Sequence, residues 1–194
     1  MALSDYTHFL KQFINQPTSI GAIAPSSERL AKRMIEWIEW DSHSVVVEFG
    51  AGSGAITSHI LDRISHRHNF FAIEINPDFV KGLKAKFPNL KIHEDSVENV
   101  AALCAKEQVD SVDAVVSGLP WAAFPGEMQD KFLDAMISVL KPGGQFTTFA
   151  YLQGLALPAG QRFKSRLKNH FSVVEKSKVT WRNLPPAFTY QCIK

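Results

Sequence analysis

Three glycines separated by single residues follow an acidic side chain near position 50. The apolar run from Val45 to Phe49 contains Glu48, and the glycines begin directly after it. This order is typical of a buried strand that enters a tight turn and then a helix. Glycine permits positive φ angles and lets the backbone approach a ligand closely, because it has no Cβ atom. The stretch predicts a site for a nucleotide-like ligand, built from Gly50, Ala51, Gly52, Ser53 and Gly54.

A second acidic residue supports this interpretation. The apolar run from Phe70 to Ile73 ends in Glu74, which lies 20 residues after Gly54. A carboxylate at that separation, at the end of the next strand, can accept hydrogen bonds from the hydroxyl groups of a ribose. A tight strand-to-helix turn that binds no ligand would explain the glycines but not the second acid. We therefore expect Glu74, with its neighbour Ile75, to contact the ligand.

Two classes of ligand share this glycine pattern. Residues 50–55 also fit G-x-G-x-x-A, which binds the pyrophosphate of nicotinamide and flavin dinucleotides. The carboxylate of Glu48 would repel a pyrophosphate, whereas it would attract an ammonium or a sulfonium group. The pattern E-x-G-x-G-x-G, followed by an acid at the end of the next strand, resembles the class I methyltransferases that bind S-adenosylmethionine.

Two later strand ends carry further candidate residues. Asp95 and Ser96 follow the third strand, where Asp95 could accept the amino hydrogen of an adenine or could cap the next helix. After the fourth strand the chain leaves the sheet in a Gly-Leu-Pro-Trp turn. Backbone carbonyls of this turn could hold an amine nucleophile while the indole faces its developing positive charge. The candidate catalytic residues are Ser117, Gly118, Leu119, Pro120 and Trp121.

Alternating strands and helices must position these residues. After the first strand, apolar periodicity predicts strands at 69–74, 90–94, 112–117 and 144–150, and helices at 54–65, 77–86, 96–106 and 126–140. A turn is expected at 141–144. The C-terminal part is predicted to contain a helix at 160–170 and strands at 171–176 and 187–193. Such alternation forms a mostly parallel sheet with its ligands at the carboxyl ends of the strands. The expected fold class is α/β: a Rossmann-like class I methyltransferase fold with a seven-stranded sheet, helices on both faces and an N-terminal helical extension.

Length and composition limit the possibilities further. A chain of 194 residues that is 45% hydrophobic can bury one core, so we expect one domain, with residues 1–40 as the extension and 41–194 as the methyltransferase domain. Two cysteines are too few for a disulfide framework, and the first residues lack the pattern of a secretion signal. No apolar run approaches the roughly 20 residues that cross a bilayer. We expect a cytoplasmic protein without a metal site, with a monomer favoured.

Both ends of the chain suggest contact with a charged or lipid surface. Nine Lys and Arg lie between Lys141 and Lys194 against Glu175 alone, an excess of +8 that suits an anionic partner or a solvated face. A short helix before Pro17 has an aromatic face that packs either on the protein's core or in a lipid interface. A second helix, capped by Ser26 or Ser27, is expected to end near Trp40. The aromatic face consists of Tyr6, Phe9, Leu10, Phe13 and Ile14.

Four stretches together resemble the bacterial phospholipid N-methyltransferases of the PmtA type. They are residues 19–27, 48–54, 117–121 and 183–188, and the resemblance covers nearly the whole chain. The family methylates the amine of phosphatidylethanolamine with S-adenosylmethionine at the cytoplasmic face of the membrane. The resemblance implies a phospholipid substrate at an anionic membrane surface, peripheral association with the inner face of the cell membrane, and an N-terminal helix that acts as a lid. An ornithine lipid amine is also compatible with this family.

The resemblance also assigns roles to individual residues. Glu48 and the three glycines would surround the methionine part of the cofactor, Glu74 the ribose, and Asp95 with Ser96 the adenine. Ser117 to Trp121 would lie beside the transferred methyl group. Arg182 would pair with the lipid phosphate, and no residue is identified as a base. The expected substrate-binding residues are Tyr6, Trp121, Phe124, Tyr151, Arg182 and Tyr190.

Two other functions share parts of this pattern. The rRNA adenine dimethylating enzymes contain E-x-G-x-G-x-G and carry Asn-Leu-Pro-Tyr after the fourth strand, where this chain has Gly118 in place of the Asn. An adenine amino group is a weak nucleophile that benefits from a side-chain acceptor, so the glycine favours an aliphatic amine and makes nucleic acid the less favoured partner. A scaffold that binds the cofactor without catalysis would leave the Gly-Leu-Pro-Trp turn without a role.

Overall fold

The computed structural model of this chain describes residues 27–65 and 68–194. The predicted aromatic helix with Tyr6, and residues 19–26 of the first family-like stretch, lie outside the described residues. Ser27 is the first described residue, and its Oγ accepts a hydrogen bond of 3.3 Å from the backbone N–H of Leu30. Ser27 therefore caps the second predicted helix, as expected from its position, but the helix ends at Ile35 rather than near Trp40.

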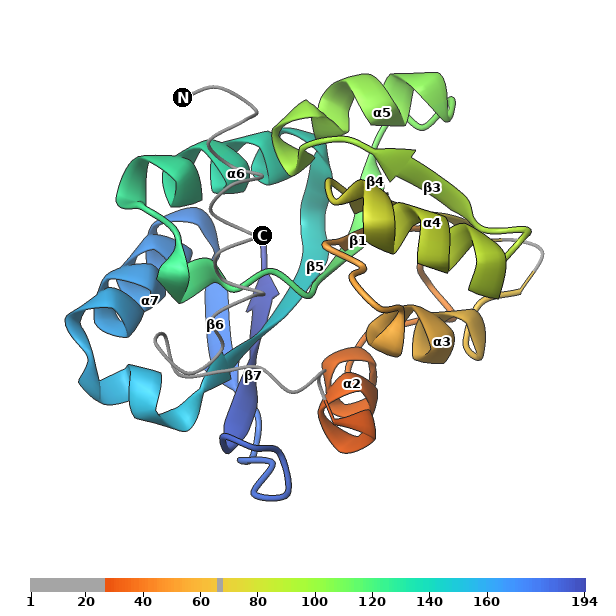
Figure 1. The fold of residues 1–194 in the computed structure, drawn as a ribbon. Helices are drawn as coiled ribbons and strands as arrows, with labels where there is room; N and C mark the ends of the chain where they lie inside the picture. Colours follow the sequence, from red (N-terminus) through yellow and green to blue (C-terminus); the bar gives the residue numbers. More distant parts are fainter. Residues whose placement is uncertain (1–26, 66–67) are drawn as a thin grey trace.

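Seven strands form one sheet, which confirms the predicted fold class (Figure 1). Their order is β3-β2-β1-β4-β5-β7-β6. β7 pairs antiparallel with both of its neighbours, whereas the pairs among β1 to β5 are parallel. The strands are β1 (Val45–Phe49), β2 (Asn69–Glu74), β3 (Lys91–Glu94), β4 (Val112–Ser117), β5 (Leu140–Tyr151), β6 (Val173–Lys176) and β7 (Ala187–Ile193).

Helices connect the strands at positions close to those predicted. The predicted helix at 96–106 divides into a 3₁₀ turn and an α-helix, and the one at 54–65 ends at Leu61. The α-helices are α2 (Glu28–Ile35), α3 (Ala55–Leu61), α4 (Pro77–Lys86), α5 (Val100–Lys106), α6 (Gly126–Val139) and α7 (Pro158–His170). The 3₁₀ segments are η1 (Val97–Asn99), η2 (Trp121–Ala123) and η3 (Leu152–Ala156).

The turn predicted at 141–144 lies instead inside β5. Leu140 already pairs with Val112 of β4, but the register shifts before Gln145 pairs with Ala114. Gly143 has a φ of 76° and absorbs this irregularity. The glycines therefore bend the strand locally without ending it, so β5 is longer than the predicted strand at 144–150.

Alternate residues of the central strands face two separate layers of helices. Val47 and Val115 belong to a large core cluster with residues of α5, α6 and α7. Val46 and Ala114 belong to a second cluster with residues of α2 and α3, and α4 packs beside it. Helices thus cover both faces of the sheet (Figure 1), and α2 contributes buried residues to the core.

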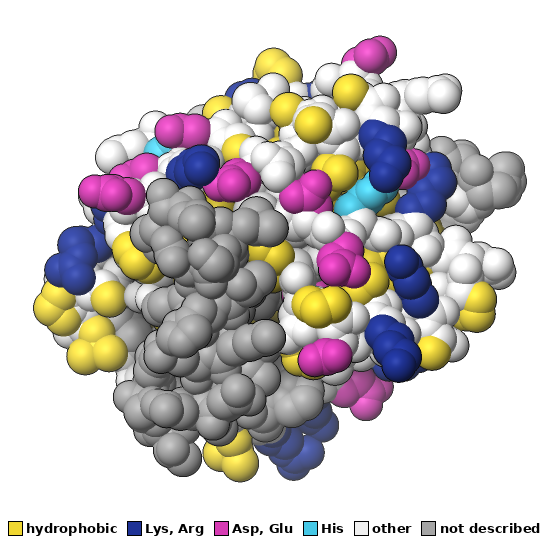
Figure 2. Space-filling view, turned by 45° about the horizontal axis from the view of Figure 1, so that its top comes forward, with side chains coloured by type: hydrophobic (Ala, Val, Ile, Leu, Met, Phe, Trp, Pro, Cys, Tyr) yellow, Lys and Arg dark blue, Asp and Glu magenta, His cyan; other side chains and the backbone are white. Residues whose placement is uncertain are grey.

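Some basic side chains in the last third of the chain form ion pairs or hydrogen bonds to backbone carbonyls. Lys141 lies 2.6 Å from Asp113, Arg166 lies 2.6 Å from Asp130, and Lys194 donates to two backbone carbonyls. On the face drawn in Figure 2, Lys and Arg side chains lie among Asp and Glu side chains. Three of the nine basic side chains in the last third of the chain are therefore engaged by acids of earlier elements or by backbone carbonyls.

The loops that leave β1 and β4 are in direct backbone contact. The N–H of Gly118 donates to the carbonyl of Phe49 at 2.8 Å. A Cβ atom added at Gly118 would lie 2.6 Å from the carbonyl oxygen of Gly50, and one added at Gly50 would lie 2.5 Å from the Leu119 side chain. The backbone contact requires glycine at position 118, and a φ of 70° favours glycine at position 50.

This contact predicts that Gly118→Ala destabilises the fold. The new methyl group meets backbone rather than a flexible side chain, so we expect the free energy of unfolding to fall by about 1–3 kcal/mol. Gly82→Ala is a matched control, because a Cβ atom at Gly82 in α4 meets nothing within 4 Å. That control should raise stability by about 0.5–1 kcal/mol. Urea unfolding measures both, and equal stability of the two variants would contradict the prediction.

Candidate active site

The register of the sheet brings three predicted site segments to one edge. Phe49 at the end of β1 pairs with Ile73 of β2 on one side and with Ser117 of β4 on the other. The glycine turn, Glu74 and the Ser117 to Trp121 segment therefore lie side by side at the carboxyl ends of parallel strands. Ligands bind at this edge in open α/β sheets.

Glu48 is fully buried beneath the glycine turn. Its Oε2 accepts a hydrogen bond of 2.7 Å from the hydroxyl of Thr57 in α3. Its Oε1 has no hydrogen-bond partner among the described residues. Burial raises the pKa of this carboxyl to about 8, against the opposing effect of the Thr57 hydrogen bond and with a further contribution from Glu74. A cationic ligand group would satisfy the free oxygen and favour the charged form.

Glu74 braces the glycine turn. Its Oε2 accepts from the N–H of Gly52 at 2.9 Å, and its Oε1 accepts from the N–H of Asn76 at 2.8 Å. Burial raises the pKa of this carboxyl despite these hydrogen bonds. Each carboxylate oxygen has a second lone pair, so the predicted ribose contact is compatible with the bracing. The bracing itself was not predicted from the sequence, since it depends on how the two loops meet.

The three glycines of the turn differ in what surrounds them. All three adopt positive φ angles, as expected. A Cβ atom at Gly52 would meet nothing within 4 Å, whereas one at Gly54 would lie 2.7 Å from the ring of Phe87. Gly50 packs on Leu119. Gly52 faces open space, while Gly50 and Gly54 allow close packing of protein on protein, and the approach of this backbone to a ligand stays a prediction. Ala51 and Ile75 are buried beside them.

Asp95 and Ser96 organise the start of the next helical segment. Asp95 Oδ1 accepts from the N–H of Ser96 at 2.7 Å and from the side-chain amide of Asn99 at 2.8 Å. Ser96 Oγ accepts a longer hydrogen bond of 3.5 Å from the N–H of Glu98. The cap of this segment is therefore Ser96 rather than Asp95, and the adenine contact of Asp95 remains a prediction. Asp95 lies beside the ribose candidate, because its N–H donates to the carbonyl of Glu74 at 3.2 Å.

Ser117 and Trp121 lock the turn after β4. The indole N–H of Trp121 donates to Ser117 Oγ at 2.9 Å, and the N–H of Leu119 donates to the same oxygen at 3.3 Å. Trp121 is only 1% exposed and stacks on Phe163 with ring centroids 5.4 Å apart. Phe124, Phe132 and Phe146 contact the indole edge-on. This geometry gives Trp121 a structural role in the turn, and the contact of its ring with a substrate cation stays a prediction.

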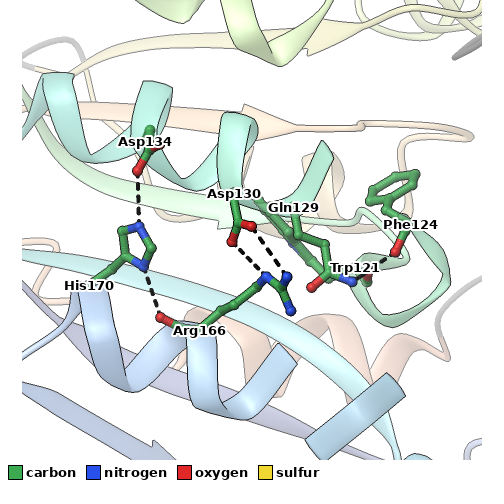
Figure 3. A network of polar contacts seen from close by, with 7 residues as sticks. All are labelled: Trp121, Phe124, Gln129, Asp130, Asp134, Arg166 and His170. Atoms are coloured by element: carbon green, nitrogen blue, oxygen red, sulfur yellow. Dashed lines mark hydrogen bonds and ion pairs between the residues drawn. The ribbon is translucent and has the colours of Figure 1, made fainter. Parts of the chain in front are cut away.

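A polar network holds the same turn between α6 and α7 (Figure 3). The amide of Gln129 donates to the carbonyls of Trp121 and Phe124 at 2.8 and 2.9 Å. Arg166 of α7 pairs with Asp130 of α6, and one turn further His170 lies 3.0 Å from Asp134 (Figure 3). Sequence reasoning missed this network, because its members lie far apart along the chain and show no shared pattern.

A cavity of about 210 Å³ opens beyond this turn, at the carboxyl ends of β4 and β5. Of the predicted substrate-binding residues, Trp121, Tyr151 and Tyr190 line it, whereas Phe124 and Arg182 do not. Arg182 is exposed on the loop between β6 and β7. Burial raises the pKa of Tyr151 and of Tyr190 to about 12, so both phenols keep their protons at neutral pH. The remaining lining is mostly apolar, with Pro120, Ala122, Ala123, Phe149, Ala150, Leu155, Leu157 and Phe163.

The part of the chain that spans residues 27–65 and 68–194 contains no cluster of three or more His, Cys, Asp or Glu side chains that could hold a metal ion. It also contains no helix that is long and apolar enough to cross a membrane.

Comparison with known proteins agrees with this geometry. Residues 46–144 match the methyltransferase domain family. An ornithine lipid N-methyltransferase from Singulisphaera acidiphila is 33% identical over 193 residues, which cover 98% of this chain and 96% of that protein.

Solved structures share the fold at low sequence identity. The magnesium protoporphyrin IX methyltransferase from Synechocystis with bound S-adenosylmethionine has a TM-score of 0.70 at 10% identity, covering 100% of this chain and 98% of that one. A 1,6-didemethyltoxoflavin-N1-methyltransferase from Burkholderia thailandensis, with bound 1,6-didemethyltoxoflavin and S-adenosylhomocysteine, has a TM-score of 0.65 at 12% identity, covering 100% of this chain and 91% of that one. With its glycine turn, its sheet order and these relatives, the chain belongs to the class I methyltransferases, with S-adenosylmethionine as its cofactor.

Proposed function

We propose that this enzyme methylates the amine of a lipid head group, with ornithine lipid and phosphatidylethanolamine as the two candidate acceptors. The observation that carries the proposal is the full-length similarity to an ornithine lipid N-methyltransferase. The apolar cavity beside the Ser117 to Trp121 turn supports it, because part of a lipid can enter such a cavity without leaving buried polar groups unpaired. Phosphatidylethanolamine is the acceptor that the resemblance to the PmtA-type family favours.

The cofactor would lie along the glycine turn. The unpaired Oε1 of Glu48 suits a cationic group of S-adenosylmethionine. The open space beside Gly52 leaves room for the cofactor to approach the backbone of the turn, and Glu74 lies where a ribose would be recognised. When bound, the cofactor supplies an electrophilic methyl group on a sulfonium centre. The protein's own part is then positioning and the exclusion of water.

The turn after β4 separates the two halves of the proposed site. Gly118 contacts the glycine turn on one side, and Trp121 lines the cavity on the other. An amine in the cavity would therefore approach the methyl group past this turn. The carbonyls of Leu119 and Pro120 accept hydrogen bonds from within the turn, so the carbonyl of Gly118 is the candidate that orients the amine.

The acceptor amine must lose a proton before its lone pair can attack. In the transfer, a nitrogen–carbon bond would form while the carbon–sulfur bond of the methyl donor breaks. The described lining of the cavity contains no Asp, Glu or His, and both of its tyrosines stay protonated. We therefore propose that the proton is lost to water before the amine enters and that no side chain acts as a base.

The geometry gives less support to the hypothesis of an RNA adenine N-methyltransferase. An Asn in place of Gly118 would bring its Cβ to within 2.6 Å of the Gly50 carbonyl oxygen. This backbone therefore offers no position for the side-chain acceptor that an adenine amino group benefits from. An aliphatic amine has no such need.

Methyl transfer from radiolabelled S-adenosylmethionine tests the proposal directly. The purified chain would be offered ornithine lipid vesicles, phosphatidylethanolamine vesicles and unmethylated rRNA in separate reactions. We expect label in one or both lipids and none in the RNA. Label in the RNA alone would contradict the proposal, and S-adenosylhomocysteine binding without transfer to any acceptor would favour a non-catalytic scaffold.

Gly52→Ala should weaken cofactor binding more than it weakens the fold. Gly143→Ala is the matched control, because both glycines have a positive φ and open space where a Cβ atom would lie. Gly143 differs in position: it lies in β5, where its N–H donates to the carbonyl of Lys194 at the C-terminus, away from the glycine turn. Each substitution should cost about 1–2 kcal/mol of stability from the left-handed backbone. Only Gly52→Ala should lower the affinity for S-adenosylhomocysteine, by about tenfold or more in calorimetry. Equal affinities would place the ligand elsewhere.

Glu48→Gln should change both the pH dependence of stability and the affinity for S-adenosylhomocysteine. Because the folded protein raises the pKa of Glu48 from 4.5 to about 8, its contribution to stability is complete below the lower value and is lost as pH rises towards the upper one. Glutamine cannot ionise, so the variant should lose less stability between pH 5 and pH 8 (about the range that the two pKa values span). Thermal unfolding of the cofactor-free protein measures this difference.

The same variant should bind S-adenosylhomocysteine about tenfold or more weakly, since a hydrogen bond to a charged group contributes about 1.5–3 kcal/mol. Thr57→Val, which removes the hydroxyl bonded to Oε2, is the companion variant. Unchanged affinity in Glu48→Gln would show that this carboxyl is a structural residue only.

A further inference from the structure

Large apolar side chains are exposed at one edge of the molecule. Within residues 27–65 and 68–194, the exposed large hydrophobic residues are Leu157, Val173, Trp181 and Leu184. Leu157 follows β5 and η3, and Trp181 and Leu184 lie in the loop between β6 and β7, residues 177–186. Because Tyr151 at the end of β5 pairs with Ala187 at the start of β7, these three side chains share the carboxyl edge of the sheet. Val173 lies at the opposite edge.

The β6–β7 loop is pinned rather than free. The N–H of Thr180 donates to the carbonyl of Ala187 at 2.6 Å, which closes the loop at its base. Asn183 is 4% exposed, accepts from the N–H of Ser27 at 3.0 Å and donates to the carbonyl of Pro185 at 2.7 Å. The buried Asn183 thus holds the middle of the loop against the start of α2.

This anchoring leaves two apolar side chains directed outward. Trp181 is 69% exposed and Leu184 is 77% exposed, on either side of the buried Asn183. Single exposed apolar residues are common on proteins. Two large apolar side chains exposed on one anchored loop indicate a surface that contacts another molecule or a membrane.

The surroundings indicate a lipid surface rather than a protein partner. Lys178 and Arg182 on the loop are exposed, and no acidic residue occurs between Lys176 and Lys194. Arg33 of α2 donates to the carbonyl of Lys178 and adds a third cation nearby. An amphipathic indole beside basic side chains suits the boundary between head groups and acyl chains of an anionic bilayer.

The loop is also joined to the proposed substrate cavity. The N–H of Leu152, at the start of η3, donates to the carbonyl of Pro186 at the end of the loop, 2.9 Å away. η3 supplies Leu155 to the cavity, and Leu157 after it also lines the cavity. A bilayer that contacts Trp181 and Leu184 would therefore lie at the same edge as the cavity.

We propose that the β6–β7 loop is a membrane contact of its own, which inserts Trp181 and Leu184 among the head groups of an anionic bilayer and directs the cavity towards the lipid. The role of this contact in catalysis rests on the proposed lipid acceptor, but vesicle binding can be measured whether or not the enzyme methylates a lipid. It is also separate from the predicted helix at the N-terminus, because every residue that carries it lies between Ser27 and Ala187.

The test uses the full chain with vesicles of phosphatidylcholine, with and without phosphatidylglycerol. The variant Trp181→Ser with Leu184→Ser changes only exposed side chains, and Val173→Ser at the opposite edge is the control. In co-sedimentation we expect the double variant to bind phosphatidylglycerol vesicles about tenfold or more weakly than the wild type, since two apolar side chains lose their burial. The control should bind like the wild type.

Two further measurements keep this proposal distinct from the proposed function. All three proteins should bind S-adenosylhomocysteine equally, which shows that the variants fold. If the double variant loses vesicle binding while no lipid amine is methylated by the wild type, the membrane contact stands and the proposed function fails. If the double variant binds vesicles as well as the wild type does, the membrane contact is wrong, whatever lipid the enzyme methylates.

Discussion

The contact between Gly50 and Gly118 is the constraint on which the rest of the site depends. A side chain at position 118 would meet the Gly50 carbonyl oxygen at 2.6 Å, so the loops after β1 and β4 can approach only as bare backbone. This approach places the glycine turn against the segment from Ser117 to Trp121. It also brings the proposed cofactor position and the apolar cavity to opposite sides of one thin turn. A separation by side chains would move the two halves apart by more than a bond-forming reaction tolerates.

Two buried carboxyls at this edge serve different purposes. Glu74 has both oxygens engaged by backbone N–H groups and holds the shape of the glycine turn. Glu48 has one oxygen engaged by Thr57 and the other unpaired among the described residues. Burial raises the pKa of both carboxyls, and a cationic or hydrogen-bonding ligand would compensate the unpaired oxygen of Glu48. A binding site that is incomplete without its ligand in this way favours a cation over a pyrophosphate.

The substrate side is built from packing rather than from charge. Trp121 is surrounded by phenylalanine rings, and its N–H is used by Ser117, so its contribution is to fix the wall of the cavity. Gln129 and the Arg166–Asp130 pair hold the turn between α6 and α7. The chemistry that we propose needs an amine, a methyl donor and a dry, fixed geometry, and it needs no catalytic side chain in the cavity.

The sequence by itself determined the α/β fold, the bounds of β2, β4, β7 and α4, the glycine turn and the class of cofactor. These follow from local signals: apolar periodicity, capping residues, and glycines beside an acid of defined spacing. Only the tertiary structure decided that Gly54 packs on Phe87, that Trp121 is core, that Lys141 and Arg166 are paired with acids, and that Trp181 and Leu184 are held in solvent. Each of these depends on a contact between residues well separated along the chain. Residue types and local spacing carry no information about such contacts, because burial is decided by which elements meet.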